Sequence, residues 1–134
     1  TLELSVDCHA LPAAQRVELD LKSMPYAVTN LLRNAIKYAR SRIVISAEVV
    51  GEHIRVHVDD DGIGIPPEER QRVFFAFTRL DRSRDRATGG YGLGLAIVRL
   101  VLEQHGGMAS TDASPLGGAR FTLDWPLSQN VTQS

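Results

Sequence analysis

The spacing of apolar residues changes along the chain, and each change predicts a new element. Apolar and polar residues alternate at 2–6 and again at 17–21, which predicts two short strands. From Ser23, a candidate N-cap, apolar residues follow at helical spacing as far as Ala39, with Pro25 in the first turn. The first third of the chain is therefore expected to form strand, strand and helix.

The later pattern predicts an α+β fold. The remaining elements are expected, in chain order, as strands at 43–50 and 54–58 joined at Gly51-Glu52, a short helix at about 68–74, a helix at 93–105 stopped by Gly106-Gly107, and strands at 108–113 and 119–126. Because strands and helices segregate, we expect a two-layer sandwich in which a mixed β-sheet has its helices packed on one face.

Two segments lack an apolar period. Residues 78–92 carry alternating arginines and aspartates followed by glycines, which predicts a long loop of the kind that often serves as a functional lid. The polar tail at 128–134 is expected to be disordered. The expected domain therefore spans residues 1–127.

Composition limits the classes of function. The 134 residues fit one domain, and a formal net charge of -1 gives no general attraction to nucleic acid or anionic lipid. Cys8 is the single cysteine, so no internal disulfide can form, and no apolar run or signal peptide indicates a membrane segment. We expect a soluble, intracellular domain, and the missing initiator Met indicates a fragment of a longer protein.

A polar stripe on the first helix carries candidate chemistry. Asn30, Asn34 and Lys37 lie nearly opposite the apolar face, with Tyr38 at the edge of the stripe. The stripe alone is also compatible with an ordinary solvent-facing side. Because Asn is disfavoured inside helices, two of them four residues apart are better explained as amide oxygens that converge on a cation, with Lys37 a turn further on to meet phosphate.

The stretch VDDDGIGIP at 58–66 has two interpretations. The offsets of Asp59, Asp61, Gly62 and Glu68 match part of a calcium-binding loop. The first position of that loop would be His57, which offers no oxygen ligand, and the preceding segment is a predicted strand. A calcium site is therefore disfavoured.

The second interpretation makes Asp60 a ligand-binding carboxylate at the end of a strand. A buried carboxylate only accepts hydrogen bonds, so it would select adenine, whose N6 donates, over guanine, whose O6 accepts. Gly62 and Gly64 follow at positions that would let a flat ligand approach the backbone closely.

The glycines of GGYGLGLAIV, at 89–98, precede a predicted helix. Glycines in this place present backbone N–H groups and the positive end of the helix dipole to phosphate. The spacing matches neither the dinucleotide-binding loop nor the P-loop. By itself the stretch is equally compatible with a flexible hinge and an anion site.

Taken in order, these motifs resemble the ATP-binding catalytic domain of sensor histidine kinases. The order is an Asn-bearing helix, D-x-G-x-G, a long lid, G-x-G-L-G-L and finally GGARF at 117–121. That domain belongs to a superfamily shared with type II topoisomerase, heat-shock and mismatch-repair ATPases. The resemblance covers about residues 1–127.

The resemblance implies a role for each motif. Asn34, with Asn30, would bind Mg²⁺, and Lys37 would contact phosphate, so that Asn30 and Lys37 are the candidate catalytic residues. Asp60 would bind adenine. The other implied ATP-binding residues are Tyr38, Gly62, Gly64, Ile65, Arg79, Gly90, Tyr91, Gly92, Leu93, Gly94 and Leu95.

The chain departs from the family pattern at three places. The phenylalanine box, 74–77 with Arg79, has Phe75 and Ala76 where an acidic residue and a proline are usual. In the last glycine box, Ala119 or Arg120 stands where threonine is common. The phosphoacceptor motif, a histidine followed by an acidic residue and Leu-Arg-x-Pro, is missing. The four histidines, His9, His53, His57 and His105, are expected to be surface or capping residues instead.

The implied function is transfer of the γ-phosphate of Mg-ATP to a histidine on a separate dimerisation domain of the same polypeptide. A response regulator would be the indirect partner, and no nucleic acid is expected. The parent would be a homodimer in the bacterial inner membrane, with this domain on the cytoplasmic side and the fragment monomeric.

Three alternatives remain from the same motifs: a stand-alone serine kinase of the anti-sigma-factor type, a hydrolase of the superfamily, and a nucleotide-sensing module without turnover. The first two groups usually carry a glutamate one helical turn before the magnesium asparagine. Here that position is Asn30, whose amide cannot take a proton, so histidine phosphorylation is favoured.

Overall fold

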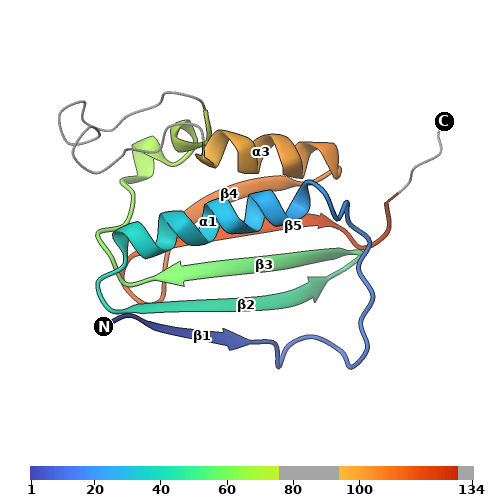
Figure 1. The fold of residues 1–134 in the computed structure, drawn as a ribbon, viewed down its shortest axis with the longest axis horizontal. Coiled ribbons are helices and arrows are strands. Elements are labelled where there is room, and N and C mark those ends of the chain that lie inside the picture. The colour runs from blue at the N-terminus through green and yellow to red at the C-terminus, as the bar shows by residue number, and fades with distance from the viewer. Residues whose placement is uncertain (76–93, 130–134) are drawn as a thin grey trace.

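The computed structural model describes residues 1–75 and 94–129, and these residues form a five-stranded mixed sheet with helices on one face (Figure 1). In chain order the elements are β1 (Glu3–Asp7), α1 (Met24–Tyr38), β2 (Arg42–Val50), β3 (His53–Asp60), two 3₁₀ turns (Pro67–Glu69 and Arg72–Phe74), α3 (Gly94–Gln104), β4 (Met108–Ala113) and β5 (Ala119–Pro126). The strand order is β1-β2-β3-β5-β4. β1 runs parallel to β2 and the other neighbours are antiparallel, which confirms the predicted α+β sandwich.

Helix α1 forms where the apolar spacing predicts it. Ser23 is the N-cap residue, although its side chain makes no capping hydrogen bond, and Pro25 occupies the first turn, where its missing N–H costs nothing. Every third or fourth residue faces the sheet, and the buried ones are Met24, Ala27, Leu31 and Ala35. The helix ends because Ala39 is extended. The helix also packs against α3.

Alternation along β3 and β5 separates an apolar face from a polar face. Toward the helices, β5 buries Phe121, Leu123 and Trp125 in the core. On the opposite face His57 bridges two strands, with its Nε2 2.8 Å from Glu48 Oε2 and its Nδ1 2.9 Å from Thr122 Oγ1. This histidine is only 8% exposed. The expectation that it is a surface residue is therefore wrong, because neighbouring polar side chains enclose it.

His105 caps the end of α3, as expected, but in a neutral form. The backbone N–H of Asp20 donates to its Nε2 at 2.9 Å, so the other ring nitrogen carries the proton and donates to the carbonyl of Val101 at 2.8 Å. A ring in this tautomer has no positive charge to offer the helix dipole. Its effect on the helix end is therefore that of a hydrogen-bond donor.

Two predicted elements take another form. Residues 17–20 form no strand and residue 21 lies in a turn. The hydrogen bonds of Glu18 go to a strand end and a side chain: its N–H donates to the Leu127 carbonyl at 2.8 Å, and Trp125 Nε1 donates to the Glu18 carbonyl at 3.3 Å. The helix expected at 68–74 is instead the pair of 3₁₀ turns.

Three other expectations lie partly or wholly outside the described residues. The lid at 78–92 and the start of the helix at Leu93 are outside them. In the tail, Gln129 is described and donates to the His105 carbonyl at 3.0 Å, so the boundary at 127 stays a prediction. None of the helices in the described part is long and apolar enough to cross a membrane.

The junction between α3 and β4 makes a stringent test of the packing. A Cβ on Gly107 would lie 1.9 Å from the Asp124 carbonyl oxygen and 2.7 Å from Trp125 Cβ. We expect Gly107→Ala to lower the free energy of unfolding by roughly 3 kcal/mol or more, because the β5 backbone cannot move away cheaply. Urea unfolding followed by circular dichroism measures the change. Gly51→Ala is the control, since its Cβ meets nothing within 4 Å and only its φ of +62° costs about 1 kcal/mol. Equal losses in the two variants would contradict the packing described.

Candidate functional site

The candidate site is built around Asp60, at the end of β3. Its side chain is 2% exposed, and Oδ1 accepts the backbone N–H of Gly62 at 2.9 Å and that of Ala119 at 3.2 Å. Within residues 1–75 and 94–129 no hydrogen bond reaches Oδ2. Burial raises the pKa of Asp60, although the two backbone N–H groups act against it. The carboxylate is thus held by one oxygen and keeps the other for an incoming donor.

Two glycines allow the backbone to close around this carboxylate. A Cβ on Gly118 would lie 2.3 Å from Asp60 Oδ1, and a Cβ on Gly62 would lie 2.1 Å from the Tyr38 carbonyl oxygen. For Gly62 the sequence predicted close approach by a flat ligand. The structure gives a different reason for this glycine, because the group pressed against it is the last turn of α1.

A small cavity brings together side chains from four parts of the chain. It is lined by Asn34, Tyr38, Asp60, Gly64, Ile65, Ala119 and Phe121. Five of these seven are residues that the sequence predicted for an ATP site. The cavity therefore has a single buried carboxylate, an amide and a phenol against walls that are largely apolar.

The other two stripe residues, Asn30 and Lys37, do not line this cavity. Asn30 Nδ2 donates to the Tyr26 carbonyl at 2.8 Å, which turns the amide oxygen toward the start of α3, where a Cβ on Gly94 would lie 3.5 Å from Asn30 Oδ1. Lys37 is exposed at the end of α1. Along one helix edge the amide oxygens of Asn30 and Asn34 and the ammonium of Lys37 thus follow each other at one-turn intervals.

The predicted phosphate loop is described only from Gly94 onward, since Arg79, Gly90, Tyr91, Gly92 and Leu93 lie outside the described residues. Gly94 is the first residue of α3. The side chain of Leu95 is 1% exposed and belongs to the core. For Leu95, only the backbone N–H in the first helical turn is available to an anion.

Asp59 points to the opposite face of the sheet from Asp60. Its carboxylate accepts two bonds from Arg120, from Nε at 2.8 Å and from Nη2 at 3.0 Å, and a third from Ser114 Oγ at 2.9 Å. The carboxylate raises the pKa of Arg120. Arg120 is thus the partner of a buried acid, and the pair supports β3 and β5 behind the site.

The calcium interpretation fails on this geometry. The carboxylate of Asp61 is bound by the backbone at Ser41, whereas that of Asp59 is bound by Arg120 and Ser114, so the two acids have different partners. In the described parts of the chain no group of three or more His, Cys, Asp or Glu side chains could hold a metal ion.

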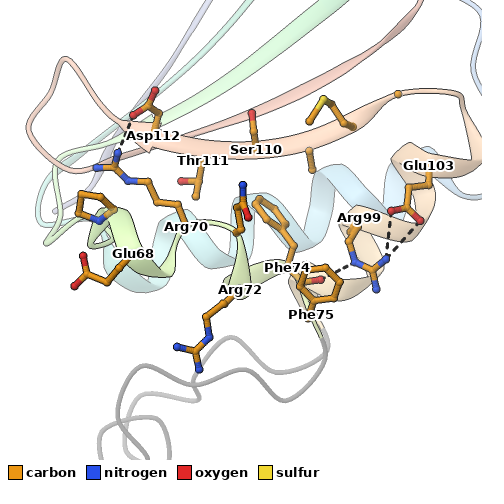
Figure 2. A pocket seen from close by; sticks show the side chains of 15 residues that line it. Glu68, Arg70, Arg72, Phe74, Phe75, Arg99, Glu103, Ser110, Thr111 and Asp112 are labelled. Carbon is orange, nitrogen blue, oxygen red and sulfur yellow. Dashed lines mark hydrogen bonds and ion pairs between the residues drawn. The ribbon is translucent and has the colours of Figure 1, made fainter.

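A separate cleft of about 750 Å³ lies between strand β4, the two 3₁₀ turns and α3 (Figure 2). Arg70 Nη1 is 3.0 Å from Asp112 Oδ1 across it. On the far side Arg99 donates from Nε to the Phe74 carbonyl at 3.0 Å and lies 4.5 Å from the centre of the Phe75 ring. The start of the phenylalanine box therefore borders this cleft and is held to α3 by one arginine.

Phe74 connects this cleft to the candidate site. Its ring meets Phe121 edge to face, with centroids 5.9 Å apart, and Phe121 lines the cavity of Asp60. The described part of the box therefore supports a wall of the cavity from behind. Ala76, Phe77 and Arg79 lie outside the described residues.

Reasoning from the sequence missed three residues of the site: Gly118, Ala119 and Phe121. Gly118 directly precedes β5, and Ala119 and Phe121 lie in its first three residues; β5 pairs with β3 in the register Asp59↔Arg120. The motif GGARF was the available signal, since it closes the ordered series of motifs, but neither its spacing nor its composition shows that β5 lies beside β3.

The raised pKa of Asp60 gives a prediction about stability. Because the folded-state pKa lies above the ordinary value of 3.8, the ionised carboxylate costs stability at neutral pH, and this cost is relieved as the pH falls through the raised pKa. We expect Asp60→Asn to unfold at a higher urea concentration than the unmodified chain at pH 7. The advantage should shrink on acidification and vanish below the ordinary pKa. Asp112→Asn, at an exposed carboxylate, is the control and should show no such advantage; a less stable Asp60→Asn protein would contradict the assignment.

Comparison with known proteins agrees with this geometry. Residues 20–129 match the family model described as histidine kinase-, DNA gyrase B-, and HSP90-like ATPase. The chain is 44% identical over 133 residues to the sensor protein RstB of Escherichia coli, covering 99% of this chain and 31% of that protein. It is also 44% identical over 117 residues to the sensor-like histidine kinase SenX3 of Mycobacterium tuberculosis, covering 86% of this chain and 28% of that protein. The chain thus spans about a third or less of these relatives.

Solved structures give the same result. The ATP-binding domain of PrrB from Mycobacterium tuberculosis superposes with a TM-score of 0.72 at 32% identity, covering 95% of this chain and 81% of that one. The histidine kinase domain of the E. coli osmosensor EnvZ gives 0.67 at 32% identity, covering 98% and 80%. The chain therefore belongs to the family of histidine kinase-, DNA gyrase B- and HSP90-like ATPases, and its relatives within that family are sensor histidine kinases.

Proposed function

We propose that this chain binds Mg-ATP and transfers the γ-phosphate to a histidine on a separate phosphoacceptor domain of the same polypeptide. The observation that carries the proposal is the buried carboxylate of Asp60, fixed through Oδ1 and with Oδ2 left to accept a hydrogen bond in an apolar cavity. The similarity of the chain to sensor kinases indicates the class of reaction.

The chemistry of this cavity suits adenine. A carboxylate accepts a hydrogen bond from the exocyclic N6 of adenine, whereas the O6 of guanine at the same place would meet another acceptor. Ile65 and Phe121 offer apolar contact to the faces of a purine. ATP should therefore be preferred over GTP.

The polar edge of α1 suits a magnesium-bound triphosphate. Mg²⁺ prefers oxygen ligands and usually keeps several waters and substrate phosphates, so one or two protein oxygens suffice. Asn34, which lines the cavity, and Asn30, whose amide oxygen faces the start of α3, would provide them. The bound ion would neutralise phosphate charge. Lys37 and the N–H groups in the first turn of α3 would contact the remaining phosphate oxygens.

The residues present favour phosphotransfer to histidine over hydrolysis. The acceptor nitrogen of a histidine has its own lone pair, so the domain needs to position the phosphate and balance its charge more than it needs a base. Asn30 occupies the place where a base is usual in the hydrolases and serine kinases, and an amide cannot serve as one. The Asn30 amide also donates to the Tyr26 carbonyl, which fixes it as part of the helix surface.

The proposed partners follow from the reaction. The phosphoacceptor domain would be the direct partner and a response regulator the indirect one. We propose that the parent is a homodimer anchored in the bacterial inner membrane, with this domain on the cytoplasmic side, and that the isolated domain is a monomer.

Calorimetry with the isolated chain tests the nucleotide assignment. We expect binding of Mg-ATP but not Mg-GTP, and a loss of roughly 10- to 100-fold in ATP affinity for Asp60→Asn, since a charge-assisted hydrogen bond is replaced by a donor facing N6. Asp112→Asn, on an exposed carboxylate away from the cavity, should bind as tightly as the unmodified chain. Unchanged affinity in Asp60→Asn would refute the adenine assignment.

Transfer of labelled phosphate from ATP to the acceptor domain, added in trans, tests the reaction. Steady release of free phosphate from ATP by the chain alone would contradict the role given to Asn30.

The magnesium assignment has its own test. In the unmodified chain, Mg²⁺ should strengthen binding of ATP. Asn34→Ala should bind ATP with a clearly weaker dependence on Mg²⁺, because one of the two proposed amide ligands is gone. The comparison is a pair of titrations with Mg²⁺ and with EDTA. If Mg²⁺ increases the ATP affinity of Asn34→Ala as much as that of the unmodified chain, Asn34 is not a ligand of the ion.

A further inference from the structure

We propose that Asp61 is a positioning residue for the nucleotide: it holds the end of α1, with Asn34 and Lys37, at a fixed place relative to Asp60 at the end of β3. The inference rests on the proposed function, because it concerns two ends of one ATP molecule. It gives Asp61, which neither the motif nor the cavity identifies, a role in binding that does not require contact with ATP.

The side chain of Asp61 is surrounded by a single short segment. Three consecutive backbone N–H groups, those of Arg40, Ser41 and Arg42, donate to Oδ1 at 2.9, 3.0 and 3.1 Å. The Ser41 hydroxyl donates to Oδ2 at 2.7 Å. The N–H and hydroxyl of Ser41 lead the bonds that hold the pKa of Asp61 well below its usual range. Successive N–H groups around one anion form a nest, and bonds to an ionised acceptor are stronger than neutral ones.

This segment is the direct continuation of α1. The helix ends at Tyr38, Ala39 is extended, and residues 40–42 lead into β2. Lys37 therefore precedes the nest by three residues, and Asn34 lies one helical turn before Lys37. Whatever fixes residues 40–42 also fixes the end of the helix edge that would bind Mg²⁺ and phosphate.

Asp61 is equally close to the adenine side of the site. It follows Asp60 directly, and it precedes Gly62, whose N–H binds Asp60 Oδ1 and whose Cα lies against the Tyr38 carbonyl. Two contacts from adjacent residues thus join the same two segments: Gly62 packs on the last turn of α1, and Asp61 binds the three residues after it. The strand end that binds adenine and the helix that binds phosphate are connected here as one unit.

A role in positioning predicts a selective effect on ligands. Adenosine has no phosphate groups to meet Lys37 or the magnesium ligands, so its affinity should be less sensitive than that of Mg-ATP to a small shift of α1. Mg-ATP must satisfy both ends at once, and a misplacement of about 1 Å between them is costly. If Asp61 only stabilised the fold, its loss would lower the affinities for adenosine and Mg-ATP together. At a temperature where the variant stays folded, it would change neither affinity.

The experiment compares adenosine and Mg-ATP on the full chain. Adenosine binding is followed by NMR titration and Mg-ATP binding by calorimetry, in the unmodified chain, in Asp61→Ala, in Asp61→Asn and in Asp112→Ala. We expect Asp61→Ala to lose on the order of 10-fold or more in affinity for Mg-ATP, with adenosine changed less than about twofold. Asp61→Asn keeps an acceptor oxygen for the nest and should recover most of the loss. Asp112→Ala removes an exposed carboxylate elsewhere and should match the unmodified chain.

The outcomes separate this inference from the proposed function. Equal losses for both ligands, or no loss for either, in a folded Asp61→Ala protein would overturn the positioning role and leave the nucleotide site standing. If the unmodified chain binds neither ligand, the proposed site fails and the inference fails with it. If Asp61→Ala does not fold, Ser41→Ala, which removes only the bond to Oδ2, replaces it: a loss confined to Mg-ATP supports the inference, and an equal effect on both ligands refutes it.

Discussion

The site depends on one buried carboxylate oxygen and the two backbone N–H groups that bind it. Oδ1 of Asp60 receives one bond from Gly62, two residues on, and another from Ala119, on the neighbouring strand. A charged oxygen inside an apolar core is costly unless it is hydrogen-bonded, so these bonds determine where β5 begins and how the chain turns after β3. The glycine at 118 follows from the same constraint, because any side chain there would occupy the place of the carboxylate.

Three consecutive aspartates have three different structural roles because the strand ends among them. Asp59 and Asp60 lie on opposite faces of β3, so one forms a buried ion pair with Arg120 and the other enters the cavity. Asp61 lies beyond the strand and binds the backbone after α1. Alternation along β3 therefore separates Asp59, which supports the sheet, from Asp60, which faces the cavity. The turn after the strand adds Asp61, which connects the strand to the helix.

Local patterns in the sequence predicted most helices and strands, but they did not predict which strands lie next to each other in the sheet. The hairpins β2-β3 and β4-β5 and helix α1 follow from alternation, turn residues and helical spacing. The same alternation at 17–21 gave no strand: Val17 and Leu19 pack against the core while Leu21 is exposed, and the hydrogen bonds of Glu18 go to Leu127 and Trp125. Alternation tells which face of a strand is buried and not which strand lies next to it. For that reason the parallel pairing of β1 with β2, and the place of β5 beside β3, were not predictable.

For the candidate site, the order of motifs pointed to residues that the structure brings together, while the physical reasons for their placement came from the structure. Asn34, Tyr38, Asp60, Gly64 and Ile65 do line one cavity. At Gly62 the Tyr38 backbone leaves no room for a side chain, and the contributions of Ala119, Phe121 and Asp61 depend on contacts between distant segments. The central claim is that the cavity of Asp60 binds the purine. A crystal structure of the chain with Mg²⁺ and a non-hydrolysable ATP analogue tests it most directly. We expect N6 of the purine at hydrogen-bond distance from the Asp60 carboxylate and the phosphates along α1. A purine bound instead in the cleft between β4 and α3 would refute the assignment.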